Sequence, residues 1–224
     1  MKTINAVLFD CDGVLVDSEV ISLEVEIAML GELGLVFERD DYLTRFMGLS
    51  TDAYHAAIDA EGRKQLGRPV SAVIRQSDRL RQEMAARLTQ VPGTTQAVAA
   101  VTLPKAIASS GSLEGLRRKL TRTGLWDLFA PHIYSADHVR DAKPAPDIFL
   151  YAAKALRVDP EDCLVIEDSI HGVAAALAAG MTVWGFLGGG HADEAMGVRL
   201  MSAGAARVVR DWPQGSILLA DLNR

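Results

Sequence analysis

Short apolar runs, each ending in small or polar residues, are the feature that most constrains the fold of this chain. The first run covers residues 4–9, and similar runs lie at residues 105–108, 163–166 and 182–186, with a weaker one at 206–209. Buried parallel strands have this β-favouring composition. Helical patterns follow the first four runs, and a rhythm of strand, turn and helix predicts a parallel sheet with crossover helices. We therefore expect a doubly wound α/β core.

The rhythm changes between the first run and the turn Val91-Pro92-Gly93. Residues 18–90 show helical patterns and no convincing strand. Ser18 can cap a helix that ends near Gly34, and further helices are expected at residues 40–46, 51–60 and 70–88. The sequence thus predicts an α/β core domain of residues 1–15 and 91–224, interrupted by an inserted all-helical domain of residues 16–90.

Composition excludes several classes of function. The chain has 224 residues and a net charge of -6, which argues against a general affinity for nucleic acid or anionic membranes. No stretch approaches the roughly 20 apolar residues of a membrane span. Cys11 and Cys163 lie far apart and outside any C-x-x-C pair, so we expect reduced thiols and no zinc site. These features predict a cytoplasmic protein, either a monomer or a weak homodimer, without nucleic-acid or membrane partners.

Polar residues that could take part in catalysis or bind a metal follow three of the expected strands. Asp10 and Asp12 come after the first, Ser109-Ser110 after the second and Glu167-Asp168 after the run 163–166, while Lys143 precedes a helix. In open α/β sheets, ligands bind beyond the carboxyl ends of the strands. Carboxylates that converge there repel one another unless a cation joins them. Oxygen ligands without His or Cys favour Mg²⁺.

Four motifs in this chain resemble those of the haloacid dehalogenase-like hydrolase superfamily. Residues 9–18 (Phe-Asp-Cys-Asp-Gly-Val-Leu-Val-Asp-Ser) resemble the first motif. Residues 107–110, 142–147 and 165–169 are similar to the second, third and fourth. The helical insertion resembles the α-helical cap that this family inserts after its first motif. The resemblance covers nearly the whole chain and implies a phosphatase, with a small phosphorylated metabolite as its partner.

The resemblance implies different catalytic roles for Asp10 and Asp12. A carboxylate such as Asp10 can attack phosphorus and form an aspartyl-phosphate. Asp12 would protonate the leaving alkoxide and then activate water. The expected cofactor is Mg²⁺, held by the Asp10 side chain, the Asp12 backbone carbonyl and Asp168, with Glu167 binding directly or through water.

The remaining motif residues are expected to hold the phosphoryl group. Ser109 would donate its hydroxyl to a phosphoryl oxygen, aided by the backbone N–H of Ser110 at a helix start. Lys143 would supply a fixed positive charge. Each residue also has a purely structural interpretation: the aspartates could belong to a turn, the serines and Glu167 could cap helices, and Lys143 could be a solvated loop residue.

Two further segments carry weaker signals. His171 lies on the helix after the fourth motif and is expected to be a surface histidine. The run Gly188-Gly189-Gly190-His191 lacks the spacing of a phosphate loop and is interpreted as a flexible connection near the mouth of the site.

Residues in the cap bear on the substrate. The loop of residues 45–50 resembles the one that descends over the active site in β-phosphoglucomutases. Ser22, Met47 and Thr51 stand where those mutases have His, Lys and Arg. We therefore expect a phosphatase for sugar phosphates or phosphogluconate, in which Arg45 holds a substrate carboxylate or hydroxyls unless it is only a surface residue. The alternatives are a hexose-phosphate mutase and a non-catalytic phosphometabolite-binding protein.

Overall fold

The chain divides into two compact units, which are described separately. The computed structural model describes residues 3–46, 51–76 and 78–222. Residues 1–19 and 88–224 make up one unit, here called the core unit, and residues 20–87 make up the other, the cap unit. Helix α1 (Ser18–Glu32) begins in the core unit and continues into the cap unit.

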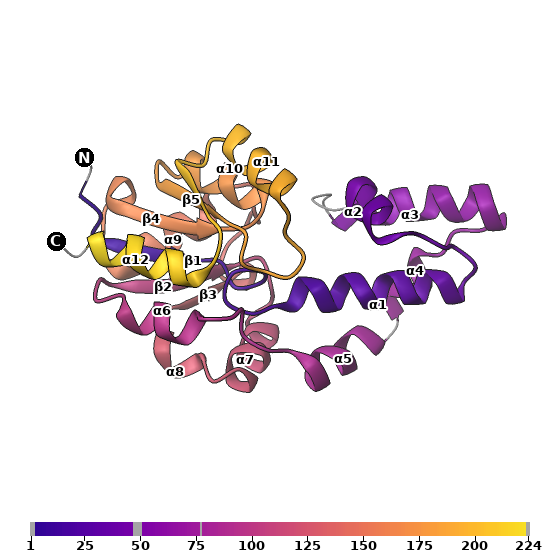
Figure 1. Ribbon diagram of the computed structural model, residues 1–224, viewed down its shortest axis with the longest axis horizontal. Coiled ribbons are helices and arrows are strands. Elements are labelled where there is room, and N and C mark those ends of the chain that lie inside the picture. Colours follow the sequence, from indigo (N-terminus) through magenta and orange to yellow (C-terminus); the bar gives the residue numbers. More distant parts are fainter. Residues whose placement is uncertain (1–2, 47–50, 77, 223–224) are drawn as a thin grey trace. The chain divides into compact units, whose positions relative to one another are not determined.

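A parallel sheet forms the centre of the core unit (Figure 1). Within the described residues it has six strands in the order β3-β2-β1-β4-β5-β6, all parallel, and helices pack against it. The central strand β1 is buried along its whole length because both of its edges and both of its faces are covered. The predicted α/β fold is confirmed. The strands are β1 (Ala6–Phe9), β2 (Lys105–Ser109), β3 (Ile133–Ser135), β4 (Cys163–Glu167), β5 (Thr182–Phe186) and β6 (Arg207–Val209).

Strand β3 was missed by the sequence analysis. It has only three residues, Ile133–Ser135, and follows Pro131 and His132. A run this short shows no measurable period, and its neighbours are typical of a loop. Pairing with β2, in which Ser109 lies opposite Ser135, stabilises it as a strand at the edge of the sheet.

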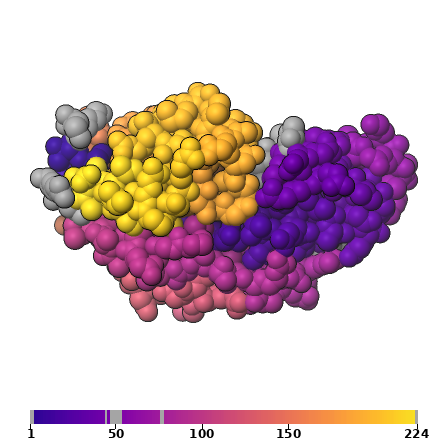
Figure 2. Space-filling view, in the orientation of Figure 1, coloured from indigo at the N-terminus to yellow at the C-terminus, as the bar shows by residue number. Residues whose placement is uncertain are grey.

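The crossover helices follow the predicted pattern. Helix α10 begins after Ser169, whose hydroxyl accepts a hydrogen bond from the N–H of Gly172 at 3.0 Å, and Gly180 follows it with φ 78°. The C-terminal helix α12 packs against α6, and both lie on the surface of the core unit (Figure 2). None of the helices in the described ranges has the length and apolar character needed to cross a membrane. The helices of this unit are α6 (Thr94–Ala100), α7 (Leu113–Arg122), α8 (Trp126–Phe129), η1 (Ala136–His138), α9 (Asp147–Leu156), η2 (Pro160–Asp162), α10 (Ile170–Ala178), α11 (Glu194–Ser202) and α12 (Trp212–Leu222).

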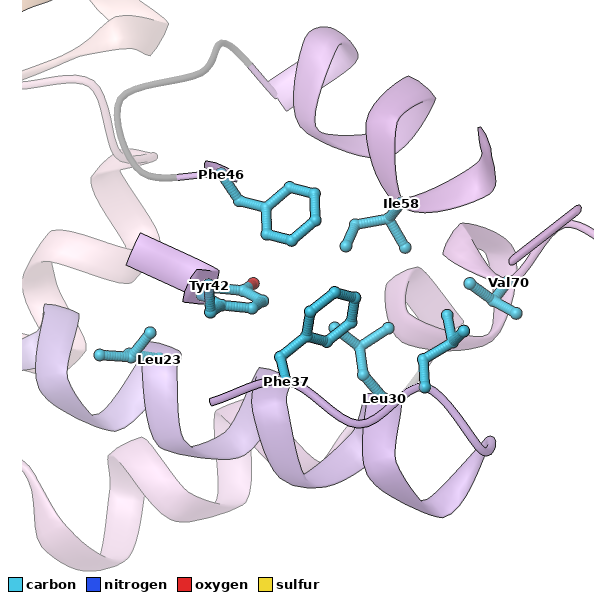
Figure 3. Close-up of a cluster of buried hydrophobic side chains, with 8 residues drawn as sticks. Leu23, Leu30, Phe37, Tyr42, Phe46, Ile58 and Val70 are labelled. Carbon is cyan, nitrogen blue, oxygen red and sulfur yellow. The ribbon is translucent and has the colours of Figure 1, made fainter. Parts of the chain in front are cut away.

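All the regular secondary structure in the described residues of the cap unit is helical, and the unit has its own apolar core (Figure 3). Three aromatic rings meet there: the ring centroids of Phe37 and Phe46 are 5.4 Å apart, and those of Tyr42 and Phe46 are 5.0 Å apart. Leu30 and Ile58 are fully buried beside them. Each such side chain contributes roughly 1.5–3 kcal/mol by burial. The helices are α1, α2 (Arg39–Phe46), α3 (Thr51–Leu66), α4 (Ser71–Gln76) and α5 (Arg79–Arg87).

Two expected helix bounds in the cap are wrong. The helix predicted over residues 70–88 is two helices, α4 and α5. Asp78 stands directly before α5, and aspartate is favoured at the start of a helix. The helix predicted over residues 51–60 continues to Leu66 and passes through Gly62, where an added Cβ atom would lie 3.1 Å from the side chain of Val70.

Candidate active site

Asp10 lies immediately after β1, at the carboxyl end of the sheet. Its N–H donates to the carbonyl oxygen of Ile166 at 3.0 Å, which extends the pairing of β1 with β4 by one residue. The side chain is almost fully buried. Burial, reinforced by the charges of Glu167, Asp168 and Asp12, raises the pKa of Asp10, while Lys143 opposes this rise.

Lys143 joins the ends of three neighbouring strands. Its Nζ donates to Asp10 Oδ1 at 2.6 Å, to Glu167 Oε1 at 2.7 Å and to the carbonyl oxygen of Ala108 at 2.9 Å. Only 4% of the side chain is exposed, so the interpretation as a solvated loop lysine is wrong. Burial alone would lower the pKa of Lys143, but Asp10 and Glu167 raise it above its ordinary value. The ammonium is therefore a fixed positive charge within the site.

Both carboxylate oxygens of Glu167 are occupied by hydrogen bonds. Oε1 accepts from Lys143, and Oε2 accepts from the N–H and the hydroxyl of Ser169 at 2.8 and 2.9 Å. A Cβ atom on Gly172 would lie 1.7 Å from Oε1, so the first turn of α10 accommodates Glu167 only because residue 172 is glycine. This arrangement positions Glu167 against Lys143.

Asp168 is buried at the end of β4 and pairs with a histidine that the sequence analysis had assigned to a flexible connection. Its Oδ2 lies 3.1 Å from Nε2 of His191, which is also buried. Burial and Glu167 raise the pKa of Asp168, and His191 lowers it. A Cβ atom on Gly13 would lie 1.9 Å from Asp168 Oδ2 and 2.8 Å from His191 Cε1. The pair is thus packed directly beneath the loop that follows β1.

Asp12 is bound by two residues that the sequence analysis did not assign to the site. Its Oδ1 accepts a hydrogen bond from the hydroxyl of Ser18 and another from Nζ of Lys119, on α7. Ser18 was interpreted as a helix cap and as the last residue of the first motif, without a role in the site, and Lys119 lies outside the four motifs. No sequence signal distinguishes Lys119 from its neighbours Arg117 and Arg118.

Ser109 is buried at the end of β2, and its Oγ accepts from the N–H of Gly111 at 3.1 Å. The helix start expected at Ser110 is wrong. Helix α7 begins at Leu113, and Ser112 is its N-cap, with its Oγ accepting from the N–H of Gly115. The N–H of Ser110 therefore belongs to the loop between β2 and α7.

The charge and chemistry of this edge suit a divalent cation. Four carboxylates, those of Asp10, Asp12, Glu167 and Asp168, belong to one electrostatic cluster, and burial raises the pKa of Asp10 and Asp168. Oxygen donors of this kind are the ligands that Mg²⁺ prefers. No three His, Cys, Asp or Glu side chains in the described ranges stand together in a metal-binding arrangement. A metal here would need backbone, phosphate or water oxygens in addition.

Arg45 belongs to the cap unit and is held by its neighbours there. It forms ion pairs with Glu61 and with Asp41, and its guanidinium lies 5.0 Å from the ring centroid of Phe46. Residues 47–50, which include Met47, lie outside the described residues, and the side chain of Thr51 is not described either. A role of Arg45 in substrate binding stays a prediction.

Known proteins share both the sequence pattern and the fold. The model of the family described as haloacid dehalogenase-like hydrolase matches residues 4–180. The 6-phosphogluconate phosphatase of Escherichia coli (strain K12) is 28% identical over 191 residues, which cover 85% of this chain and 86% of the relative. Hexitol phosphatase B of the same strain is 33% identical over 189 residues, covering 80% of this chain and 82% of the relative. The solved HAD family hydrolase from Deinococcus radiodurans R1 with bound phosphate and sodium is 35% identical with a TM-score of 0.85, covering 100% of this chain and 98% of that one.

Proposed function

The chain belongs to the haloacid dehalogenase-like hydrolase family, and we propose that it is a Mg²⁺-dependent phosphatase that works through an aspartyl-phosphate. The family and the enzyme class expected from the four motifs are confirmed. The observation that carries the mechanism is the buried ammonium of Lys143, 2.6 Å from Asp10 Oδ1. A fixed cation beside a carboxylate allows a phosphate dianion to approach that carboxylate and stabilises the charge of the transferring group.

Asp10 is the proposed nucleophile. Its carboxylate attacks phosphorus, a new P–O bond forms, and the bond to the substrate oxygen breaks. Asp12 gives a proton to the departing oxygen, and then accepts a proton from the water that hydrolyses the aspartyl-phosphate. Acid–base assistance of this kind contributes about 10²–10⁴-fold. Inorganic phosphate leaves, and both aspartates return to their starting state.

The proposed metal ligands are the Asp10 side chain, the Asp12 backbone carbonyl and Asp168. Bound Mg²⁺ would neutralise part of the negative charge shared by Asp10 and the phosphoryl group. His191 would orient Asp168 through the contact between its Nε2 and Asp168 Oδ2. Since both oxygens of Glu167 already accept hydrogen bonds, we propose that Glu167 positions Lys143 and would bind Mg²⁺ through water rather than directly.

Ser109, Ser110 and Lys143 are the proposed phosphate-binding residues. The buried hydroxyl of Ser109 stands at the end of β2, directly beside β1, so it can donate to a phosphoryl oxygen. The N–H of Ser110 lies in the adjoining loop and can donate to a second oxygen. Together with the ammonium of Lys143, these donors match the acceptors of a phosphoryl group.

The proposed substrate is a small sugar phosphate or a phosphogluconate-like molecule. Two relatives of similar length are a 6-phosphogluconate phosphatase and a hexitol phosphatase. Arg45 is the proposed cap residue for a substrate carboxylate or hydroxyl. Ser22, Met47 and Thr51 disfavour the alternative of a hexose-phosphate mutase. Retention of Asp10, Asp12, Lys143 and Asp168 disfavours a non-catalytic binding protein.

The test is phosphate release from 6-phosphogluconate, hexitol phosphates, hexose phosphates and nucleotides, each with Mg²⁺ and with a chelator. We expect release from the sugar acids or polyols, dependence on Mg²⁺, and no activity in Asp10→Asn. Full activity in Asp10→Asn or in the chelated sample would refute the mechanism. Isomer formation exceeding phosphate release would favour the mutase.

A further inference from the structure

Asp12 is held by a lysine from a helix that carries none of the four motifs. Nζ of Lys119 donates to Asp12 Oδ1, the same oxygen that accepts from the hydroxyl of Ser18. We propose that Lys119 is a positioning residue, which anchors Asp12 by Oδ1 and leaves Oδ2 to exchange protons with the leaving group and with water. This inference rests on the proposed function, because it assigns the geometry of the general acid.

In the structure, Lys119 lies beside the buried face of α7. Leu116 and Leu120 are fully buried, and Lys119 lies three residues after the first and directly before the second. Only 25% of its side chain is exposed. From this partly buried position its Nζ reaches Asp12 Oδ1.

The neighbouring cations of α7 have different partners. Arg118 pairs with Glu114 on the exposed side of the helix, and Arg117 lies over the ring of Trp126 at 5.7 Å. Among these three basic residues, Lys119 alone reaches the active site. The aliphatic part of a lysine can cover apolar surface while its charged end makes a specific contact, and Lys119 has this arrangement.

The second oxygen of Asp12 faces the phosphate-binding loop. A Cβ atom on Gly111 would lie 4.0 Å from Asp12 Oδ2 and 3.5 Å from Ser109 Oγ. Oδ2 therefore borders the same space as the serine proposed to hold a phosphoryl oxygen. With Oδ1 fixed by two donors, the carboxylate cannot rotate freely, and Oδ2 is the atom presented to the leaving oxygen.

Anchoring a general acid matters only for substrates whose leaving group needs a proton. The sugar alkoxide of 6-phosphogluconate does, whereas p-nitrophenolate departs as a stable anion. The ratio kcat/KM reports every step up to cleavage of the substrate P–O bond and omits hydrolysis of the phosphoenzyme. A comparison of kcat/KM for the two substrates therefore isolates the contribution of the acid.

The experiment compares Lys119→Met, Lys119→Arg and the wild type on 6-phosphogluconate and p-nitrophenyl phosphate. We expect Lys119→Met to lower kcat/KM for 6-phosphogluconate by about 10²-fold, while p-nitrophenyl phosphate changes by less than about 3-fold. Lys119→Arg should restore part of the loss because it keeps the charge. Arg118→Met, on the exposed side of α7, should change neither value.

Partial misfolding cannot imitate this result, because the ratio between the two substrates within one preparation does not depend on the fraction of active enzyme. An equal loss on both substrates, or no loss on either, would overturn the role of Lys119. The variant Asp12→Asn distinguishes a failure of the role of Lys119 from a failure of the proposed role of Asp12 as the general acid. If Asp12→Asn shows the selective loss and Lys119→Met does not, the inference alone fails; if Asp12→Asn lacks it, the proposed acid itself is wrong.

Discussion

The ammonium of Lys143 lies 2.6 Å from the Oδ1 atom of Asp10, in a site where only 4% of the lysine side chain is exposed. The same nitrogen also binds Glu167 at 2.7 Å. Two buried carboxylates at the ends of adjacent strands thus share one positive charge. This makes Lys143 important for the stability of the fold as well as for the reaction.

Replacing Lys143 by methionine should damage both properties. Lys143→Met keeps the length of the side chain but leaves Asp10 and Glu167 without a counter-charge. Breaking a buried ion pair costs about 3–5 kcal/mol of unfolding free energy, and loss of the fixed cation should lower kcat by at least about 10²-fold. Urea unfolding and phosphate release measure the two effects. Lys154→Met, on the exposed side of α9, is the control, and equal behaviour of the two variants would contradict the assignment.

A substitution at Gly172 tests whether Glu167 positions Lys143. In Gly172→Ala the new Cβ atom would stand 1.7 Å from Glu167 Oε1, so Glu167 must move and its bond to Lys143 must change. We expect a loss of about 1–3 kcal/mol in stability and a clear fall in kcat. The matched control is Gly31→Ala, on an exposed part of α1 with no heavy atom within 4 Å of the added carbon. That substitution should stabilise the protein by about 0.4–1 kcal/mol. A fully active, undamaged Gly172→Ala enzyme would argue against a positioning role for Glu167.

His191 should control the affinity for Mg²⁺. Its Nε2 is 3.1 Å from Asp168 Oδ2, and residues that orient a metal ligand typically contribute 10–100-fold to metal affinity. His191→Gln should therefore need about 10–100-fold more Mg²⁺ for half-maximal phosphate release. The Mg²⁺ concentration that raises the melting temperature should shift in parallel. His171→Gln serves as the control on the adjacent helix. An unchanged Mg²⁺ requirement in His191→Gln would show that the contact has no influence on the metal.

The stability of the metal-free protein should depend on pH through Glu19. Burial, together with the charges of Asp12 and Asp168, raises the pKa of Glu19 from 4.5 to about 7, although the positive charges of His191 and Lys119 oppose this. The Glu19 carboxyl therefore holds its proton more tightly in the folded state than in the unfolded state. Its contribution to the unfolding free energy is complete below pH 4.5 and is lost as the pH rises through about 7.

The amide in Glu19→Gln does not titrate, so this variant should lack the pH-dependent contribution of Glu19 to the unfolding free energy. With a chelator present, the unfolding free energy of the wild type should fall between pH 5 and pH 7.5 relative to that of Glu19→Gln, by an amount on the order of 1 kcal/mol or more. Glu38→Gln, at an exposed position of the cap unit, should leave the pH profile of the wild type unchanged. Parallel profiles for the wild type and Glu19→Gln would rule out this assignment.

The main features of the fold follow from local sequence patterns. The apolar runs that became β1, β2, β4 and β5 are long enough to show their type, and Ser169 and Gly180 mark the ends of α10 by known capping preferences. Strand β3 has three residues and is stabilised by pairing with β2, a long-range contact that no local pattern records. The division between α4 and α5 was also missed, because the helical pattern continues across it.

In the site, too, long-range contacts could not be predicted from local sequence patterns. Asp10, Asp12, Lys143 and Asp168 could be proposed because each follows or precedes a recognisable element at the carboxyl edge of the sheet. The contacts of His191 and Lys119 could not, because they bring together residues 23 and 107 positions apart in the sequence. The three glycines that precede His191 indicated a loop. Nothing in the sequence of α7 indicates which of its basic residues contacts the active site.

The covalent role of Asp10 is tested most directly by trapping the phosphoenzyme. Asp12→Asn lacks the proposed base, so p-nitrophenyl phosphate should phosphorylate it without rapid hydrolysis of the product. The account predicts an intact mass increased by one phosphoryl group, and reduction by borohydride to an alcohol at position 10 in the mapped peptide. Asp10→Asn combined with Asp12→Asn should show neither change. A phosphoryl group attached to another residue, or its persistence in the double variant, would contradict the assignment of Asp10 as the nucleophile.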